Sequence, residues 1–242
     1  MTEARPAFYA LAPGGWRDYV TLLHPPYTLW HLSYVAIGAA LAPRFHGDLL
    51  ALTAGAFFLA LGIGAHALDE LHGRPLETRI PEWALRGLAA VTIAAAVGIG
   101  VGVALTRDLW LLVFVAFGCF IVIAYNLELF GGRFHGDLWF ALAWGAFPVA
   151  TAYFASAETV HPEAVFAAAF AALLSHAQRV LSTQVREVRR RATSVGGTIV
   201  LDDGRSRLID QDAMIAAPEQ ALRVLAMAVV ALAVALVALR VT

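Results

Sequence analysis

The chain contains no lysine and a single cysteine, and only 14% of its 242 residues are charged. All 17 basic residues are therefore arginines, and Cys119 has no partner for an intrachain disulfide. Soluble domains carry about 25% charged residues and about 45–50% apolar ones. This chain is instead 60% hydrophobic, with a mean hydropathy of +0.71. The shortage of charge excludes an ordinary soluble domain and indicates an integral membrane protein, for which we expect no nucleic-acid partner.

Seven apolar stretches have the roughly 17–25 residues that a helix needs to cross a bilayer core. We expect these spans near 27–43, 49–71, 83–105, 109–127, 138–155, 164–182 and 216–239. The sixth stretch continues as a charged helix through Arg191. The sequence therefore predicts an all-α fold: one polytopic transmembrane helix bundle over 27–242, preceded by a cytoplasmic or interfacial leader over 1–26.

Arginine is distributed unevenly between the two expected sides of the membrane. One side receives Arg5, Arg17, Arg74, Arg79, Arg86, Arg133, Arg186, Arg189, Arg190, Arg191, Arg205, Arg207 and Arg223. The opposite side receives Arg44, Arg107 and Arg240. By the positive-inside rule, we expect a multi-pass protein of the cell membrane whose N-terminus is cytoplasmic and whose C-terminus is outside.

The loop over 192–217 carries a hairpin signal. Asp203-Gly204 lies between the alternating stretches 198–202 and 205–209, and aspartate-glycine at such a place is typical of a tight β-turn. We therefore expect a small cytoplasmic β-hairpin. An isolated hairpin is only marginally stable in water, so we expect it to rest on the rest of the protein.

Several ionisable groups meet at the point where the second span ends. Residues three or four apart share one face of a helix, so His66 shares a face with Asp69 and Glu70. Gly73 then ends the helix and Pro75 prevents it from restarting. Ionisable groups at the membrane boundary are costly, and we therefore expect a functional site here.

A second polar group follows the sixth span. Helical spacing places His176, Thr183 and Glu187 on one stripe, next to Gln184 and an arginine run that begins at Arg186. Carboxylates on two facing helices can hold Mg²⁺ through a ligand's phosphates, and arginines bind phosphate in bidentate fashion. With apolar helices below to bury a hydrocarbon tail, the two groups together predict a site for a lipid diphosphate.

The same residues also have simpler interpretations. The arginine run can serve as a positive-inside anchor, and His66 can be a hydrogen-bonded packing residue. Asp69 and Glu70 can be solvated, or can pair with Arg74 and Arg79. These alternatives remain open at the level of sequence.

Three stretches resemble the UbiA superfamily of intramembrane prenyltransferases. Residues 69–81 (DELHGRPLETRIP) are similar to the end of the family's first aspartate motif and its Arg-Pro element. Tyr125-Asn126 and 144–148 (WGAFP) resemble the family's fourth and fifth helices, and 184–198 resembles the second aspartate motif. The resemblance implies an all-helical fold, a polyprenyl diphosphate held through Mg²⁺ by two cytoplasmic motifs, and transfer of the prenyl group to a lipid-like or aromatic acceptor.

The chain departs from the family pattern at both motifs. Each family motif reads Asp-x-x-Asp-x-x-x-Asp, whereas the corresponding positions here are His66, Asp69 and Gly73 in the first, and begin with Gln184 and Glu187 in the second. The family normally has nine spans, and seven are expected here. A weakened magnesium site is the consequence that we expect.

The leading hypothesis assigns three groups of residues. Catalysis is assigned to Asp69, Glu70 and Glu187, and the metal to His66, Asp69 and Glu187. Substrate binding is assigned to Arg74, Arg79, Arg186, Arg190, His31, Tyr125, Asn126, Gln184 and His176. One alternative is a non-catalytic lipid-binding or assembly protein on a degenerate UbiA-like scaffold. A second is a metalloenzyme that uses His66, Asp69 and His176, because imidazole suits Zn or Fe better than Mg.

Overall fold

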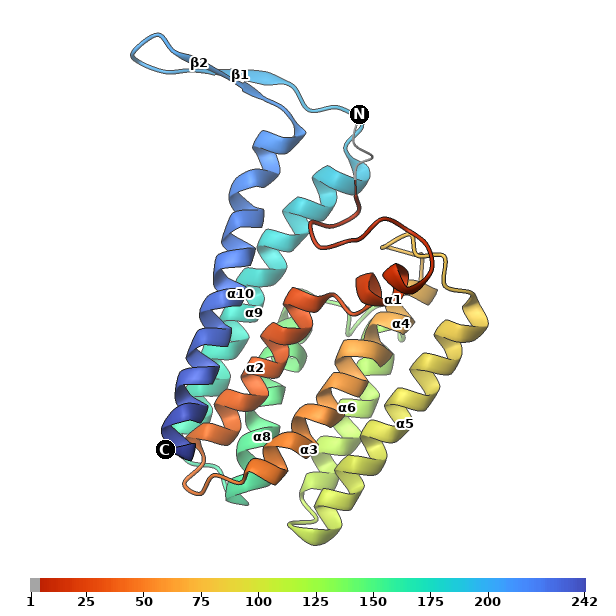
Figure 1. Cartoon of the computed structure of the whole chain (residues 1–242), viewed down its shortest axis with the longest axis vertical. Helices are drawn as coiled ribbons and strands as arrows, with labels where there is room; N and C mark the ends of the chain where they lie inside the picture. The colour runs from red at the N-terminus through yellow and green to blue at the C-terminus, as the bar shows by residue number, and fades with distance from the viewer. Residues whose placement is uncertain (1–4) are drawn as a thin grey trace.

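The computed structural model describes residues 5–242, which form a bundle of helices that run along a common direction (Figure 1). Beyond a short helix in the leader, α1 (Trp16–Leu22), seven helical segments make up the bundle. They are Pro25–Leu41 (α2), Gly47–Leu71 (α3, η1 and α4), Glu82–Thr106 (α5), Leu111–Asn126 (α6), Asp137–Ala157 (α7, η2 and α8), Pro162–Arg191 (α9) and Gln211–Val241 (α10). Most segments begin and end within a few residues of an expected span. The helix α9 continues beyond its expected span into the charged stretch that ends at Arg191, as predicted.

Five of these segments are long and apolar enough to cross a membrane: Gly47–Leu71, Glu82–Thr106, Asp137–Ala157, Pro162–Arg191 and Gln211–Val241. The helix α6 is apolar but has only 16 residues, and α2 has 17. Length and composition therefore support a multi-pass membrane protein.

Two of the segments change to π-helical geometry partway along. The second runs as α3 (Gly47–Phe57), η1 (Phe58–Ala65) and α4 (His66–Leu71). The fifth runs as α7 (Asp137–Phe140), η2 (Ala141–Ala146) and α8 (Phe147–Ala157). Such wider turns are rare and occur often beside functional sites.

Close helix contacts hold the bundle together at glycines. A methyl group on Gly38 of α2 would overlap the carbonyl oxygen of Val149 in α8, and one on Gly145 of η2 would overlap the carbonyl oxygen of Ala171 in α9. Small residues of this kind let helix backbones approach closely where hydrophobic burial gives little driving force. They fix α2 and α9 against the fifth segment, and all three line the site described below.

The two chain ends lie at opposite ends of the bundle (Figure 1). At the end near the C-terminus, two of the three arginines expected there are engaged: Arg107 pairs with Glu158 at 3.1 Å, and Arg240 donates a hydrogen bond to the carbonyl oxygen of Ala42. The other end holds the leader, the end of α4, the end of α9 and the hairpin.

The hairpin forms at the predicted turn, with β1 (Gly197–Val200) antiparallel to β2 (Ser206–Ile209). The expectation that it rests on the rest of the protein is wrong, because seven of its eight strand residues are exposed. It extends beyond α9 and α10 (Figure 1). The chain enters the hairpin from α9 and leaves it into α10, and these two helices pack against each other. They hold the two ends of the hairpin close together.

Candidate functional site

A cavity of about 550 Å³ lies at the end of the bundle that carries the N-terminus. Its walls come from α2, α4, α6, η2 and α9, and the leader covers it. The ionisable residues that line it are Asp69, Glu128, Glu187, Arg179, Arg186, Arg190, Arg191, His24, His31, His66, His72 and His135. The two polar groups singled out in the sequence, one on α4 and one on α9, therefore face the same space.

Eight of the predicted site residues line this cavity. They are His31, His66, Asp69, Tyr125, Asn126, Arg186, Glu187 and Arg190. Asp69 comes from the last turn of α4, and Glu187 from the part of α9 that continues beyond its apolar stretch. The carboxylates from two helices that the lipid-diphosphate hypothesis requires therefore lie on walls of one cavity.

Glu70 has a different place from the predicted one. Its side chain is completely buried and does not line the cavity. One carboxylate oxygen accepts hydrogen bonds from the backbone N–H and the hydroxyl of Thr78, both at 2.8 Å, and the other accepts from the backbone N–H of Leu76 at 3.0 Å. Glu70 therefore stabilises the loop after α4, because these donors would otherwise be buried without a partner.

Arg74 and Arg79 also serve this loop and do not line the cavity. The Nη1 of Arg74 donates to the carbonyl oxygens of Thr78 (2.9 Å) and Ile80 (2.7 Å). The side chain of Arg79 is exposed, and its backbone N–H donates to the buried carboxylate of Asp18 at 2.9 Å. A substrate-binding role was predicted for these two arginines. In the structure neither lines the cavity, and the contacts described above hold the loop instead.

His176 and Gln184 are exposed and lie outside the cavity lining. The buried face of α9 runs through Ala171, Ser175, Gln178, Ser182 and Val185. This face is offset by one or two residues from the stripe predicted through positions 176, 183 and 187. The predicted stripe is therefore right only in part: Thr183 and Glu187 line the cavity, whereas His176 is exposed and lies away from the other two residues of the proposed metalloenzyme.

The leader contributes residues that the sequence did not single out. Pro6, Phe8 and Tyr9 line the cavity, and the Nε of Arg190 donates to the carbonyl oxygen of Pro6 at 3.3 Å. The ring of Tyr9 lies 5.3 Å from that of His24. Burial raises the pKa of Tyr9 above its ordinary value, so its hydroxyl stays neutral. The leader is therefore part of the site as well as a surface segment.

Two histidines stack on each other where α2 begins. The rings of His24 and His66 are 3.9 Å apart and nearly parallel, with an interplanar angle of 11°. Burial, together with the neighbouring His66 and the charges of Arg190 and Arg186, lowers the pKa of His24 well below its ordinary value of 6.5. The ring of His24 is therefore neutral at physiological pH, which permits the stacking.

Two of the arginines of α9, Arg186 and Arg190, are available to a ligand, whereas Arg189 pairs with Glu219 at 2.7 Å. Arg179 pairs with Asp137 at 3.1 Å, and Arg186 donates to the hydroxyl of Thr183 at 2.9 Å. Within residues 5–242, Arg186 and Arg190 have no carboxylate partner. Guanidinium groups that are held in place but not neutralised favour an anion, and phosphate suits their planar fork.

Two further polar atoms on the cavity-lining residues lack partners. The hydroxyl oxygen of Tyr125 and the Oε1 of Gln178 are buried and have no hydrogen bond within the part of the chain that the structure describes. Buried polar atoms are normally satisfied by protein, water or a ligand. Both residues line the cavity, so a bound molecule or ordered water there can satisfy them.

The residues of the cavity do not form a protein-only metal centre. No three His, Cys, Asp or Glu side chains between residues 5 and 242 are grouped so that they could hold a metal ion. Mg²⁺ commonly uses one or two protein carboxylates together with substrate phosphates, and Asp69 and Glu187 satisfy this smaller requirement. The magnesium expectation therefore stays a prediction that depends on a phosphate ligand.

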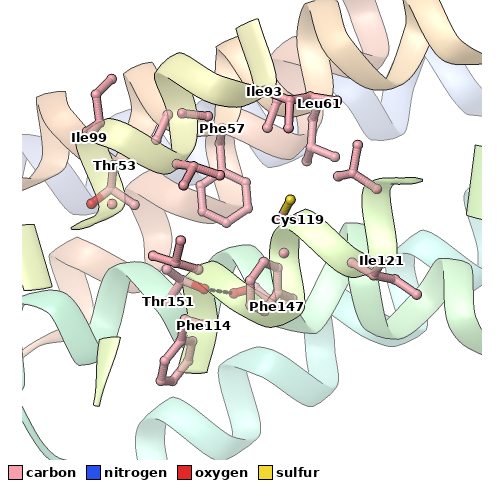
Figure 2. Close-up of a pocket in the computed structure, with 18 of the residues that line it drawn as sticks. Thr53, Phe57, Leu61, Ile93, Ile99, Phe114, Cys119, Ile121, Phe147 and Thr151 are labelled. Carbon is pink, nitrogen blue, oxygen red and sulfur yellow. Dashed lines mark hydrogen bonds between the residues drawn. The ribbon is translucent and has the colours of Figure 1, made fainter. Parts of the chain in front are cut away.

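A second, apolar pocket lies deeper in the bundle (Figure 2). It has a volume of about 110 Å³ and is lined by α3, η1, α5, α6, η2 and α8, among others by Phe57, Leu61, Ile93, Phe114, Cys119 and Phe147. Its lining is mostly apolar, and the hydroxyl of Thr151 donates to the carbonyl oxygen of Phe147 at 2.7 Å. Trp144 lines both this pocket and the polar cavity, so the two adjoin at its ring.

No protein-family model matches the chain, and no curated protein or solved structure matches it. The interpretation of the site therefore rests on its own geometry.

Proposed function

We propose that this protein is a divergent UbiA-like prenyltransferase that binds an isoprenoid diphosphate and transfers its prenyl group to a lipid-like or aromatic acceptor. The observation that carries the proposal is the cavity shared by α4 and α9. Asp69 and Glu187 line it together with Arg186 and Arg190, which have no carboxylate partner within residues 5–242, and an apolar pocket adjoins at Trp144. The charged cavity suits the diphosphate group of such a lipid, and the adjoining apolar pocket suits its hydrocarbon tail.

The proposal includes a membrane topology. All seven helical segments cross the bilayer, with the arginine-rich end in the cytoplasm and the C-terminus outside. The shortest, α6 and α2, have 16 and 17 residues and correspond to about 24–26 Å of helix, which a bilayer can accommodate by local thinning. The placement of the chain ends at opposite ends of the bundle supports an odd number of crossings.

The arginines supply the main electrostatic contribution. As the bond between the prenyl C1 and the diphosphate oxygen breaks, negative charge grows on the leaving group, and Arg186 and Arg190 stabilise that charge. Asp69 and Glu187 are the residues that would hold a Mg²⁺ ion together with the diphosphate, and such an ion would supply further neutralisation of the charge on the leaving group.

The aromatic wall stabilises the other product of that bond cleavage. The ring of Tyr125 lies 4.3 Å from that of Trp144, and Phe140 stacks on Trp144 at 5.7 Å with an interplanar angle of 9°. All three line the cavity, and Trp144 also lines the apolar pocket. Aromatic faces attract cations, so this wall suits an allylic carbon that becomes positive.

The test is binding of farnesyl diphosphate to the purified full-length protein, with farnesol and inorganic diphosphate as matched half-ligands. We expect saturable binding of radiolabelled farnesyl diphosphate that Mg²⁺ strengthens. Each half-ligand should compete far more weakly, because one lacks the head and the other the tail. Failure of prenyl diphosphates of every chain length to bind would defeat the proposal.

A non-catalytic lipid-binding protein is the second candidate. It is favoured by the incomplete carboxylate set, since the cavity has no three-ligand metal group within the described residues. This candidate predicts the same binding of farnesyl diphosphate, but no release of inorganic diphosphate. It also predicts that the Asp69→Ala and Glu187→Ala variants keep their cellular function.

A further inference from the structure

The imidazole of His31 has a defined tautomer. Its Nδ1 lies 2.8 Å from the carbonyl oxygen of Trp144, and a carbonyl oxygen only accepts hydrogen bonds. The proton of the neutral ring is therefore on Nδ1, and Nε2 carries a free lone pair. Within residues 5–242, no side chain or backbone group donates a hydrogen bond to that lone pair.

The position of His31 separates it from the charged part of the cavity. It lies six residues beyond the start of α2, about 9 Å along the helix axis, and it is 4% exposed. Its ring is 6.2 Å from that of Phe140 in an edge arrangement. Because Trp144 lines both spaces, the residue that holds His31 in place also marks the junction of the polar cavity and the apolar pocket.

Two other histidines of the cavity share this tautomer but differ in surroundings. The Nδ1 of His66 faces the carbonyl oxygen of Gly62 at 3.1 Å, and that of His135 faces the carbonyl oxygen of Tyr125 at 2.9 Å. His66 is stacked on His24, and Nδ1 of His135 lies 4.0 Å from the carboxylate of Glu128. The ring of His135 also packs against the aromatic wall, 4.4 Å from that of Tyr125, but it has the Glu128 carboxylate beside it. Of these three, His31 is the one bonded to Trp144, the residue that lines both the polar cavity and the apolar pocket.

We propose that His31 is the general base of the transfer reaction and accepts the acceptor's proton at Nε2. The inference rests on the proposed function. The C1–O bond of the prenyl diphosphate breaks and its electron pair leaves with the diphosphate. The nucleophilic oxygen or ring carbon of the acceptor forms a new bond to C1, and the proton that it carried moves to Nε2 of His31. The proton then passes through the cavity to the departing diphosphate or to water.

This assignment also specifies the acceptor class. A general base is needed only if the nucleophilic atom bears a proton that must leave, as in an alcohol, a phenol or an activated aromatic ring. The apolar and aromatic surroundings of His31 favour a phenol or a similar ring over a highly charged acceptor.

Two substitutions at His31 distinguish the role of Nδ1 from that of Nε2. In His31→Asn the side-chain amide can occupy the place of Nδ1 and still donate to the Trp144 carbonyl, but nothing replaces the Nε2 lone pair. In His31→Ala both functions are lost and a cavity the size of an imidazole remains. His176→Ala is the matched control, because His176 is an exposed histidine of α9 outside the cavity.

The experiment measures binding of farnesyl diphosphate and its transfer to 4-alkylphenols by full-length protein in lipid vesicles. We expect His31→Asn to bind farnesyl diphosphate within about twofold of the unsubstituted protein, and its transfer rate to fall by about 10²–10⁴-fold, the usual contribution of a general base. Added imidazole should restore part of the transfer in His31→Ala and change nothing in His176→Ala.

The outcomes distinguish the two proposals. If the unsubstituted protein binds no prenyl diphosphate, the proposed function itself is wrong. If it binds and transfers, but His31→Asn transfers equally fast or loses binding and transfer in equal proportion, only the assignment of His31 is overturned. Binding without any transfer by the unsubstituted protein overturns the assignment as well, and leaves the non-catalytic candidate.

Discussion

The segments that follow the second and sixth apolar stretches contain the same kinds of residue and use them differently. After α4, the charged side chains of Glu70 and Arg74 bond to the backbone of the loop that they belong to. On α9, Arg186 and Arg190 remain available to the cavity. The reason is that a loop that reverses direction leaves backbone groups without partners, whereas a continuous helix satisfies its own. The charged side chains therefore bond to the loop where the helix ends, whereas Arg186 and Arg190 face the cavity where the helix continues.

The largest effect should come from removing Glu70. In Glu70→Ala the backbone N–H groups of Leu76 and Thr78 lose their acceptor inside the protein, and we expect a loss of about 3 kcal/mol or more in the free energy of unfolding. Glu187→Ala, on an exposed residue of α9, should change stability by less than about 0.5 kcal/mol. Unfolding of both variants in detergent would measure this difference, and equal losses would contradict the contrast between the two segments.

The same contrast applies to the arginines. Arg186→Ala should weaken binding of farnesyl diphosphate by about 10- to 100-fold, because a charge-assisted hydrogen bond contributes about 1.5–3 kcal/mol. Arg74→Ala should lower stability through its lost bonds to Thr78 and Ile80, while the folded protein keeps its affinity. Direct binding measurements on both folded variants test this. A loss of affinity in Arg74→Ala alone would reverse the interpretation.

His66 of α4 lines the cavity and stacks on His24. The buried environment of His24 predicts a pH dependence of stability. Because the pKa of His24 is lower in the folded protein than its ordinary value of 6.5, the unfolded chain takes up the proton first as the pH falls. Stability from this group is therefore fully present above about pH 6.5 and decreases below it, by up to about 1.4 kcal/mol per pH unit.

The matched variant for this prediction is His24→Asn, since asparagine tolerates the left-handed backbone of this residue, whose φ is +46°. The loss of stability between pH 7 and pH 5.5 should be smaller in the variant than in the unsubstituted protein. Identical pH profiles would show that His24 takes up its proton equally in the folded and unfolded states, and would contradict the lowered pKa.

The smallest effect should concern magnesium. If Asp69 and Glu187 share the ion with the diphosphate, Asp69→Asn and Glu187→Gln should each remove most of a few-fold stimulation of farnesyl diphosphate binding by Mg²⁺. Glu82→Gln, an exposed residue paired with Arg86 outside the cavity, is the control and should keep the stimulation. Unchanged stimulation in both cavity variants would place the ion elsewhere or exclude it.

Much of the fold was predictable because it depends on local properties. The positions of the helical segments follow from hydrophobic length, and the turn of the hairpin follows from Asp203-Gly204. The rotation of α9 was not predictable in the same way, because polar residues occur on its exposed face as well as on its cavity face. His176 and Gln184 were assigned to the site for that reason, and both lie outside it.

The sequence by itself determined that this is a multi-helical membrane protein with polar groups collected at one end, since composition and hydrophobic length do not depend on how the helices pack. Only the tertiary structure decided which of those groups share a cavity. In that structure Glu70 and Arg74 bond to the loop after α4, and the leader lies over the cavity. His31 bonds to the backbone of Trp144, a residue 113 positions away in the chain. Such contacts depend on helix rotation and on backbone groups in need of partners, and both are settled only when the whole bundle is assembled.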